Sequence, residues 1–399
     1  MRIRRILPLL LILVLLLPAA VACGGAKAPV DNGTTEPPAV TAEGTTEPAT
    51  EEVTEPAPVT YELENHPVSE NLSSLKLLGR SLVRDNSVIL DWSAAGVSFR
   101  YHGAGALRLT ATRTGAAKDV ELVVTVDARV YSVSVGSVGQ RTYVVPANVK
   151  DGDHTVTIRR KTMVEQNAQG VNLTLDSVWF GGSFLARPAD NTYQVAFIGD
   201  SITCGVGLVN TTSAAENGVA TYAVDFADRE NVDYDICAIS GIGVYRSTQK
   251  HGYTTNNMTK YYPYFNYYRD PDIAYTPARK ADLVVVNLNT NDNGNGRTDD
   301  DKTAYQTALK QLISEIRAAH GANVPVVWVV GMMIAQDAPT NQWLNEVFDE
   351  LGGETAGLYR LLVDTNKTGG ASHPNSASHR SVSQKLSAFV REKNLLDLG

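Results

Sequence analysis

The hydrophobic texture of the chain changes near Pro188, and this change constrains the fold more than any other feature. Before Pro188, apolar and polar residues alternate in short runs broken by turn residues, which is typical of half-buried strands. After Pro188, near-continuous apolar runs are separated by helical patterns, which is typical of a parallel sheet covered on both faces. A chain of 399 residues with two such halves predicts two domains of different class.

The first half predicts an all-β sandwich, or jelly roll, over residues 61–188. Glycine-containing segments at 103–105 and 151–153 are expected to form tight turns, and no helical stretch interrupts the pattern. The alternating runs lie at residues 97–101, 107–111, 120–126, 130–135, 143–145 and 154–158.

The second half, residues 189–399, predicts an α/β domain of the three-layer kind with a central parallel sheet. Residues 303–320 repeat apolar side chains at helical spacing, which predicts a helix packed on that sheet. Chemistry is expected in the loops that follow the strand ends. The expected strands lie at residues 194–198, 234–239, 283–288 and 324–330.

The N-terminus predicts export. Arg2, Arg4 and Arg5 precede an apolar run and then a set of small residues, which is the layout of a secretory signal peptide over residues 1–22. The apolar run covers residues 6–17 and is interrupted by proline, so it is short for a membrane-spanning helix, which needs about 20 residues.

The end of this signal resembles the lipobox of bacterial lipoproteins, because residues 20–23 read Ala-Val-Ala-Cys. The resemblance implies lipidation of Cys23, and simple cleavage that leaves Cys23 as an ordinary thiol is the alternative. Residues 23–60 are rich in Thr, Glu and Pro and cannot bury a core, so they are expected to form a disordered, extended tether. The sequence therefore predicts an exported protein on the bacterial cell surface, held at the membrane by its lipid anchor only.

Composition excludes one class of partner. The formal net charge is −8, and no basic field is available to hold a phosphate backbone, so nucleic acid is not expected as a partner. The 3 cysteines are too few for a disulfide scaffold. Cys204 and Cys237 are expected to be buried free thiols, with a disulfide between them as the alternative.

The residues with chemical potential follow the expected strands of the second half. Ser201 comes directly after the first strand, where a strand-to-helix turn would expose it and the helix N-terminus would offer N–H groups to an oxyanion. A helix cap is the structural alternative. A nucleophile also needs a base and an oxyanion site. Gly241 follows the second strand, Asn291 follows the third, and His373 lies near the C-terminus.

The order Ser, Gly, Asn, His resembles that of the SGNH (GDSL-type) hydrolases, and the surrounding strings resemble carbohydrate esterase family two, which contains acetylxylan esterase-like enzymes. The resemblance covers residues 61–399 and includes the jelly roll. It implies removal of O-acetyl groups from xylan-type or mannan-type polysaccharides or oligosaccharides, without a metal or an organic cofactor. The strings that carry it are Phe-Ile-Gly-Asp-Ser-Ile-Thr-Cys-Gly at 197–205, Ser-Gly-Ile-Gly-Val-Tyr-Arg at 240–246, Asn-Leu-Asn-Thr-Asn-Asp at 287–292 and His-Pro-Asn-Ser at 373–376.

The resemblance also implies roles for individual residues. Ser201 would be the nucleophile and His373 the general base. The backbone N–H groups of Ser201 and Gly241 and the side chain of Asn291 would form the oxyanion hole.

Three further residues near these blocks compete for a chemical role. Asp200 and Asp292 are expected to be structural, bonded to loop backbone around the site. His379 is the rival for the base, but it falls inside the helix expected after His373, where a packed or solvent-facing histidine is the interpretation.

Two departures from the family pattern stand out. The superfamily has an Asp three residues before the catalytic His, and here that position is Gly370, so a backbone carbonyl is expected to orient His373 in a Ser–His dyad. Asn289 stands where the family usually has Gly, and it is expected to narrow the acyl pocket or to contact the sugar.

Two other functions remain open from the sequence. A lysophospholipase or another acyl esterase would use the same chemistry. A non-catalytic polysaccharide-binding lipoprotein would keep the fold without turnover. Residues 253–275 contain 7 of the 17 tyrosines, and we expect most to pack on the sheet and one or two to line the cleft.

Overall fold

The computed structural model describes residues 60–115, 119–164, 172–294, 297–298 and 300–399. The signal peptide, Cys23 and nearly all of the expected tether lie outside these residues. The described part belongs to one compact unit, residues 57–399, so the boundary between residues 61–188 and 189–399 stays a prediction. None of the helices in the described ranges is long and apolar enough to cross a membrane.

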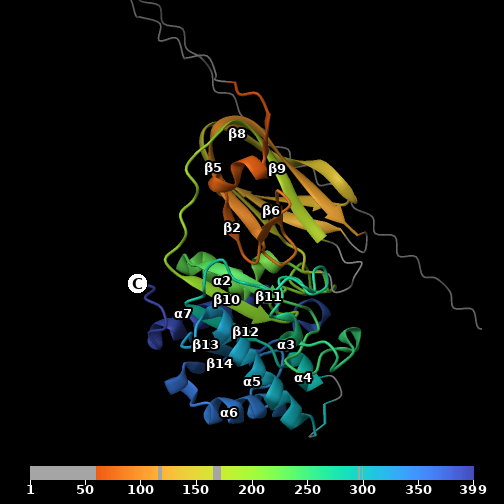
Figure 1. Ribbon diagram of the computed structural model, residues 1–399, viewed down its shortest axis with the longest axis vertical. Helices are drawn as coiled ribbons and strands as arrows, with labels where there is room; N and C mark the ends of the chain where they lie inside the picture. Colours follow the sequence, from red (N-terminus) through yellow and green to blue (C-terminus); the bar gives the residue numbers. More distant parts are fainter. Residues whose placement is uncertain (1–59, 116–118, 165–171, 295–296, 299) are drawn as a thin grey trace, which may run out of the picture. The chain divides into compact units, whose positions relative to one another are not determined.

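The first half forms the expected all-β structure, in which the described strands pair antiparallel in one sheet (Figure 1). The sheet runs in the order β3-β4-β9-β5-β8-β6-β7, with β1 paired to β9 and β2 to β5. A short helix α1 (Val68–Asn71) follows β1. The strands are β1 (Glu64–Pro67), β2 (Lys76–Leu78), β3 (Leu82–Arg84), β4 (Ser87–Ile89), β5 (Gly96–Thr114), β6 (Val120–Val126), β7 (Arg129–Val135), β8 (Gly139–Arg160) and β9 (Asn172–Phe184).

The two tight turns expected in this half are wrong. Residues 103–105 lie inside β5 and residues 151–153 inside β8, where Gly103 pairs with Gly152 across the ladder. The register shifts between Gly103 and Gly105, so these glycines mark a bulge rather than a chain reversal. A Cβ atom on Gly103 would lie 1.8 Å from the Gly181 carbonyl oxygen, which explains why glycine is needed in this strand.

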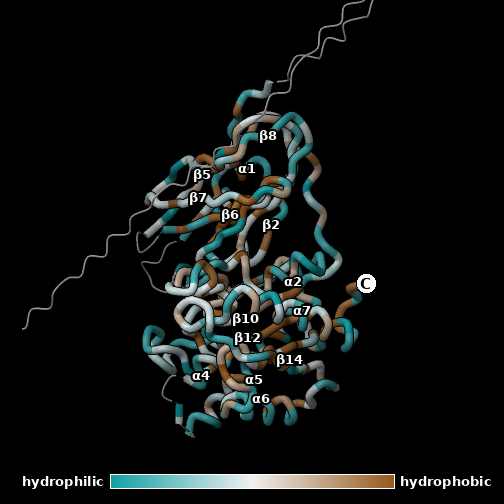
Figure 2. The backbone as a smooth tube through the Cα atoms, turned by 180° about the vertical axis from the view of Figure 1, so that it is seen from behind, coloured by the Kyte–Doolittle hydropathy of each residue, from teal (hydrophilic) through white to brown (hydrophobic). Residues whose placement is uncertain are grey.

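The second half contains a parallel sheet in the order β11-β10-β12-β13-β14, as the α/β prediction requires. Figure 2 shows hydrophobic segments along its strands and hydrophilic segments in many of the loops. The four strands predicted from continuous apolar runs are confirmed. The fifth strand, β14, was not expected, because its side chains alternate irregularly between buried and exposed. The strands are β10 (Gln194–Gly199), β11 (Asp233–Ala238), β12 (Leu283–Asn287), β13 (Val326–Met332) and β14 (Leu358–Thr365).

Helices cover both faces of the parallel sheet. The helices α2 (Tyr222–Glu230) and α7 (Ser376–Glu392) pack against one face through a common apolar cluster. The helices α5 (Asp301–His320) and α6 (Pro339–Glu350) contribute to the cluster on the other face. The apolar strand residues are buried on both sides, which is why their sequence pattern shows no alternation.

Candidate active site

The structure brings Ser201 and His373 together at the carboxyl end of the parallel sheet. Ser201 follows β10, and its Oγ atom lies 2.8 Å from Nε2 of His373. His373 comes after the short 3₁₀ helix η5 (Gly370–Ser372), and Asn375 caps α7 just beyond it. A hydroxyl at this distance from an imidazole nitrogen has the geometry of a nucleophile and its base.

The local fold at Ser201 differs from the expectation. Residues 201–205 form turns, and the next α-helix, α2, begins only at Tyr222. The prediction of a helix N-terminus directly after Ser201 is therefore wrong, and no helix dipole is available from that segment. The reason lies in Gly205 and Gly207, whose φ angles of 76° and 78° turn the chain away from a helical path.

A backbone carbonyl contacts the other nitrogen of the His373 ring. Nδ1 lies 2.9 Å from the carbonyl oxygen of Ala371. Ala371 and Ser372 both have left-handed backbone conformations, with φ angles of 50° and 57°, and this reversal turns the carbonyl toward the ring. Because a carbonyl only accepts, Nδ1 carries the proton and Nε2 is left to accept from Ser201.

The same geometry explains the glycine at position 370. A Cβ atom on Gly370 would lie 2.0 Å from the Ser213 carbonyl oxygen and 2.4 Å from that of Asn210. No larger side chain fits there without movement of the backbone, so an aspartate cannot be accommodated at this position in the present fold.

Burial keeps His373 neutral. Loss of solvent lowers the pKa of His373 from its usual range, and the hydrogen bonds to the Ala371 and Gly370 carbonyls act in the opposite direction. The net shift is downward, so the imidazole is unprotonated at neutral pH and available as a base.

The candidate oxyanion donors lie at the ends of the neighbouring strands. The register pairs Gly199 of β10 with the last residues of β11 and β12, so the loops that hold Ser201, Gly241 and Asn291 leave the same edge of the sheet. The Nδ2 atom of Asn291 donates to the Ile242 carbonyl at 2.7 Å and lies 3.3 Å from Oδ2 of Asp200.

Two fully buried carboxylates hold these loops. Asp292 accepts hydrogen bonds from three consecutive backbone N–H groups, those of residues 244, 245 and 246, at 2.9, 2.8 and 2.8 Å. Asp200 accepts from the Ile202 N–H at 2.9 Å. Burial raises the pKa of Asp200 to about 7 and that of Asp292 to about 6, with backbone hydrogen bonds opposing the rise. Their contacts are to loop backbone and to Asn291.

His379 lies away from the position of a base. It is buried in α7, and its Nδ1 accepts a hydrogen bond from the Tyr222 backbone N–H at 3.1 Å. Burial lowers the pKa of His379 to about 3, with the nearby His373 adding to the effect. This histidine packs against the Tyr222 ring and stays neutral.

The side chain of Asn289 is withdrawn from solvent. It is completely buried, and its amide is used by Tyr305, whose hydroxyl donates at 2.7 Å, and by Asn341, which accepts at 3.0 Å. The expectation that this side chain contacts the sugar is therefore not met, and the alternative, that it narrows the acyl pocket, stays a prediction. Its φ angle of 89° lies in the left-handed region, which explains why glycine also suits this position.

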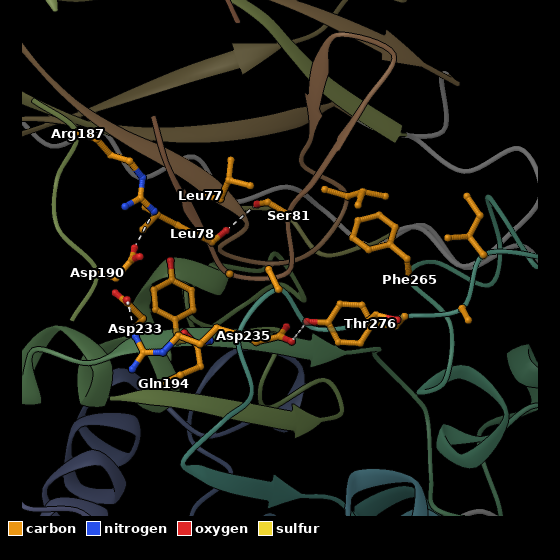
Figure 3. Close-up of a pocket in the computed structure, with 18 residues that line it drawn as sticks. Leu77, Leu78, Ser81, Arg187, Asp190, Gln194, Asp233, Asp235, Phe265 and Thr276 are labelled. Atoms are coloured by element: carbon orange, nitrogen blue, oxygen red, sulfur yellow. Dashed lines mark hydrogen bonds and ion pairs between the residues drawn. The ribbon is translucent and has the colours of Figure 1, made fainter. Parts of the chain in front are cut away.

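A cavity of about 400 Å³ lies between residues 77–82 of the β half and the first residues of β10 and β11 (Figure 3). Its lining includes Gln194, which begins β10, and Asp233, which begins β11, so it faces the amino ends of these strands. Arg187 and Asp190 form an ion pair of 2.7 Å at its rim. It is separate from the Ser201 site.

Cys204 and Cys237 are both buried, and no disulfide joins them in the part of the chain that the structure describes. In the described ranges, no group of three or more His, Cys, Asp or Glu side chains is arranged to hold a metal ion.

A backbone carbonyl beside His373 was expected, and the structure identifies it as that of Ala371. Sequence reasoning could not say which carbonyl it is, because its orientation depends on two consecutive left-handed residues that are not glycine. His251 was missed, and its ring nitrogen lies 2.9 Å from the carbonyl oxygen of Ser240, next to the candidate donor Gly241.

The four proposed site residues all lie in a segment that matches a known protein family. Residues 197–380 match the model of the GDSL-like Lipase/Acylhydrolase family. The family expectation from the sequence is thus confirmed.

Known proteins resemble the chain in sequence and in structure. The cellulase/esterase CelE of Acetivibrio thermocellus is 29% identical over 234 residues, which cover 53% of this chain and 27% of that protein. A family two carbohydrate esterase from Clostridium thermocellum, solved in complex with cellohexaose, is 24% identical with a TM-score of 0.70 and covers 81% of this chain and 100% of that one. An acetyl xylan esterase from the rumen bacterium Butyrivibrio proteoclasticus is 18% identical with a TM-score of 0.72 and covers 83% and 98%. These structural likenesses confirm the predicted fold, an antiparallel β domain before an SGNH-type sheet.

Proposed function

We propose that the protein is a serine esterase that removes O-acetyl groups from polysaccharides or oligosaccharides through an acetyl-Ser201 intermediate. The observation that supports this most directly is the 2.8 Å contact between Ser201 Oγ and His373 Nε2, with Nδ1 of the same ring bonded to a carbonyl. A Ser–His dyad oriented by the Ala371 carbonyl is the arrangement that we propose in place of a triad.

The reaction proceeds in two balanced halves. His373 Nε2 takes the proton of Ser201 as Oγ attacks the acetyl carbonyl carbon, and the N–H groups of Ser201 and Gly241 with the Asn291 amide stabilise the negative oxygen. The tetrahedral intermediate collapses, the bond to the sugar oxygen breaks, and His373 returns its proton to that oxygen. Water then repeats the sequence on the acetyl-serine and releases acetate and free Ser201.

The substrate class follows from the relatives. Family two carbohydrate esterases and an acetyl xylan esterase share the fold, and one of them is described in complex with cellohexaose. The matched segment is about a quarter of the length of the curated relative, 27%, so its activity is carried to this chain only as part of the proposal. An acetylated xylan-type or mannan-type polysaccharide is the substrate that we propose.

We also propose that the enzyme acts outside the cell. The signal-like residues 1–22, the lipobox-like Cys23 and the Thr/Glu/Pro-rich residues 23–60 support export, lipid attachment and a tether. Metabolic labelling with a fatty-acid analogue, in wild type and Cys23→Ala, tests the anchor. Label retained in Cys23→Ala would refute attachment at this residue.

The test of the reaction is acetate release from acetylated xylan, acetylated mannan and 4-nitrophenyl acetate. Wild type is expected to release acetate, and Ser201→Ala and His373→Ala are each expected to lose at least about 10³-fold in kcat/KM. Ser314→Ala, an exposed serine on α5, serves as the matched control and should keep full activity. Activity only on long-chain esters would favour the lysophospholipase alternative, and saccharide binding without turnover would favour the binding lipoprotein.

A further inference from the structure

We infer that His251 is a positioning residue of the oxyanion hole, acting through the peptide unit that joins Ser240 to Gly241. The inference rests on the proposed function, because it concerns how the Gly241 N–H is held and polarised. His251 ends the short 3₁₀ helix η3 (Gln249–His251) and is 2% exposed. Its Nε2 atom lies 2.9 Å from the carbonyl oxygen of Ser240.

The Ser240 carbonyl and the Gly241 N–H belong to one planar peptide unit. The carbonyl can only accept, so Nε2 of His251 carries the proton in this contact. A donor on the carbonyl oxygen fixes the plane of the peptide and draws electron density toward the oxygen, which makes the N–H at the other end a stronger donor. His251 thereby acts on the oxyanion hole without touching the substrate.

The backbone around Gly241 is packed directly on this histidine. Gly241 has a φ angle of 85°, and a Cβ atom there would lie 2.7 Å from Thr248 Oγ1 and 3.3 Å from His251 Nε2. The Thr248 N–H donates to the Gly241 carbonyl at 2.8 Å, and the His251 N–H donates to the Thr248 carbonyl at 2.9 Å. The loop and the imidazole thus form one closed unit.

The second ring nitrogen connects His251 to the tyrosine-rich segment. Nδ1 lies 3.2 Å from the Tyr268 hydroxyl, and the hydroxyls of Tyr268 and Tyr261 are 2.7 Å apart. Burial lowers the pKa of His251, and the bond to the Ser240 carbonyl opposes that shift. The ring is therefore neutral, and Nε2 is the donor to the Ser240 carbonyl.

The β domain holds the same tyrosine-rich segment from the other side. The Arg80 guanidinium donates to the carbonyls of Tyr262 and Tyr264 at 3.0 and 2.7 Å, and the Trp92 indole donates to the Phe265 carbonyl at 2.8 Å.

The completely buried carboxylate of Asp91, also in the β domain, adds two contacts to this segment. It accepts from the Asn266 amide at 3.0 Å and pairs with Arg269 at 3.2 Å. This line of contacts runs from the β domain through Tyr268 and His251 to the peptide of Gly241, which gives the β domain a part in holding the oxyanion hole.

The test compares two buried histidines. His251→Phe removes the donor to Ser240, and His320→Phe is the matched control. His320 is 6% exposed and also bonds a tyrosine hydroxyl, that of Tyr262, at 2.9 Å, while its other ring nitrogen accepts from the Ala281 N–H at 3.1 Å, outside the oxyanion loop. With 4-nitrophenyl acetate, His251→Phe is expected to lower kcat about 10- to 100-fold and to change KM by no more than about twofold. This loss of kcat is smaller than the loss of about 10²–10³-fold that follows removal of a whole oxyanion donor. His320→Phe is expected to lower the melting temperature and leave kcat unchanged.

Rescue by a conservative variant distinguishes a specific role of His251 in positioning the Gly241 N–H from a general loss of stability around it. His251→Gln keeps an N–H donor near the Nε2 position and is expected to recover most of kcat, while affinity for a trifluoromethyl ketone, which mimics the oxyanion, should follow kcat across the series. If His251→Phe does not fold, His251→Gln and Tyr268→Phe carry the test, with an expected kcat loss of about two- to fivefold for Tyr268→Phe.

The outcomes are distinct. Unchanged kcat and ketone affinity in the folded variants would overturn the role of His251, as would an equal loss in His320→Phe. Absence of hydrolysis by wild type would instead overturn the proposed function.

Discussion

Carboxylates at the two ends of the parallel sheet have different partners and opposite shifts in pKa. At the carboxyl end, Asp200 and Asp292 are fully buried, are held by backbone N–H groups, and have raised pKa values of about 7 and about 6. At the amino end, Asp233 pairs with Lys76 at 2.7 Å and with Arg279 at 3.4 Å. Asp190 pairs with Arg187 there, and that ion pair lowers the pKa of Asp190.

This difference distinguishes carboxylates that stabilise the fold from carboxylates that hold the loops of the proposed site. Carboxylates with cationic partners are placed where they contribute to folding, and they surround a cavity that does not contain Ser201. Carboxylates without such partners are costly to bury, and here they orient the loops that carry the candidate oxyanion donors. The raised carboxyl pKa values at the carboxyl end of the sheet are therefore consistent with the position of the proposed site.

The largest contrast between the two ends is expected for Asn291→Ala at the carboxyl end. Loss of a side-chain donor to the oxyanion should lower kcat about 10²–10³-fold with little change in KM. Steady-state kinetics with 4-nitrophenyl acetate measure the effect. A rise in KM at constant kcat would mean that Asn291 binds the substrate equally in the ground and transition states, against the proposed role.

At the amino end, Asp233→Asn should have the reverse effect. The carboxylate accepts from Lys76 and Arg279 and is half-buried, so its loss should lower the free energy of unfolding by about 1–3 kcal/mol. Urea unfolding and kcat measured side by side check this. A loss of kcat comparable to that of Asn291→Ala would break the distinction between the two ends.

The effect of pH on the free energy of unfolding should also differ in sign between the carboxyl groups at the two ends. Asp200 has a folded pKa of about 7, above its unfolded value near 3.8, so its contribution to stability is fully present below about pH 4 and is lost as pH rises to about 7. The stability of Asp200→Asn relative to wild type should therefore increase across that window, by at most a few kcal/mol.

Asp190→Asn is the matched control for that window. Its pKa is lowered in the folded state, so its contribution is present above the unfolded value and is lost only as pH falls below about 4. The difference between Asp190→Asn and wild type should be flat from about pH 5 to 8. A flat difference for Asp200→Asn as well would contradict a raised pKa at that residue. Urea titrations at several pH values measure both.

The smallest effect is expected on the acidic side of the pH profile of kcat/KM. Burial lowers the pKa of His373, so kcat/KM should stay high below its ordinary value of 6.5 and fall only at more acidic pH. The pH profile of kcat/KM with an uncharged acetyl ester measures this limb. A limb above 6.5 would indicate a carboxylate near the ring, which the geometry of Gly370 does not provide.

Much of the fold could be predicted because burial leaves a direct signal. The strands β10 to β13 are apolar on both faces, and the helical spacing of α5 is regular. β14 gave no such signal, because its burial is irregular. The glycines of β5 and β8 were misinterpreted as turns, since a bulge and a chain reversal use the same residue for the same conformational freedom.

The candidate site could be predicted as a set of residues but not as a set of contacts. Ser201, Gly241, Asn291 and His373 follow strand ends or occur in family-like strings, so the sequence identifies them. The orientation of His373 depends on the backbone angles of Ala371 and Ser372, and these angles cannot be predicted from the side chains in the sequence. The remaining expectations for Cys23 and the tether stay predictions.

The role of Ser201 as nucleophile is tested by the site at which a fluorophosphonate attaches to the protein, located by peptide mass spectrometry. An activated serine nucleophile forms a covalent phosphonyl ester, whereas a serine that only caps a turn does not. A single label is expected on Ser201, absent in Ser201→Ala and retained in Ser314→Ala. No label on wild type, or a label that persists in Ser201→Ala, would contradict the claim that the carboxyl end of the sheet holds an esterase nucleophile.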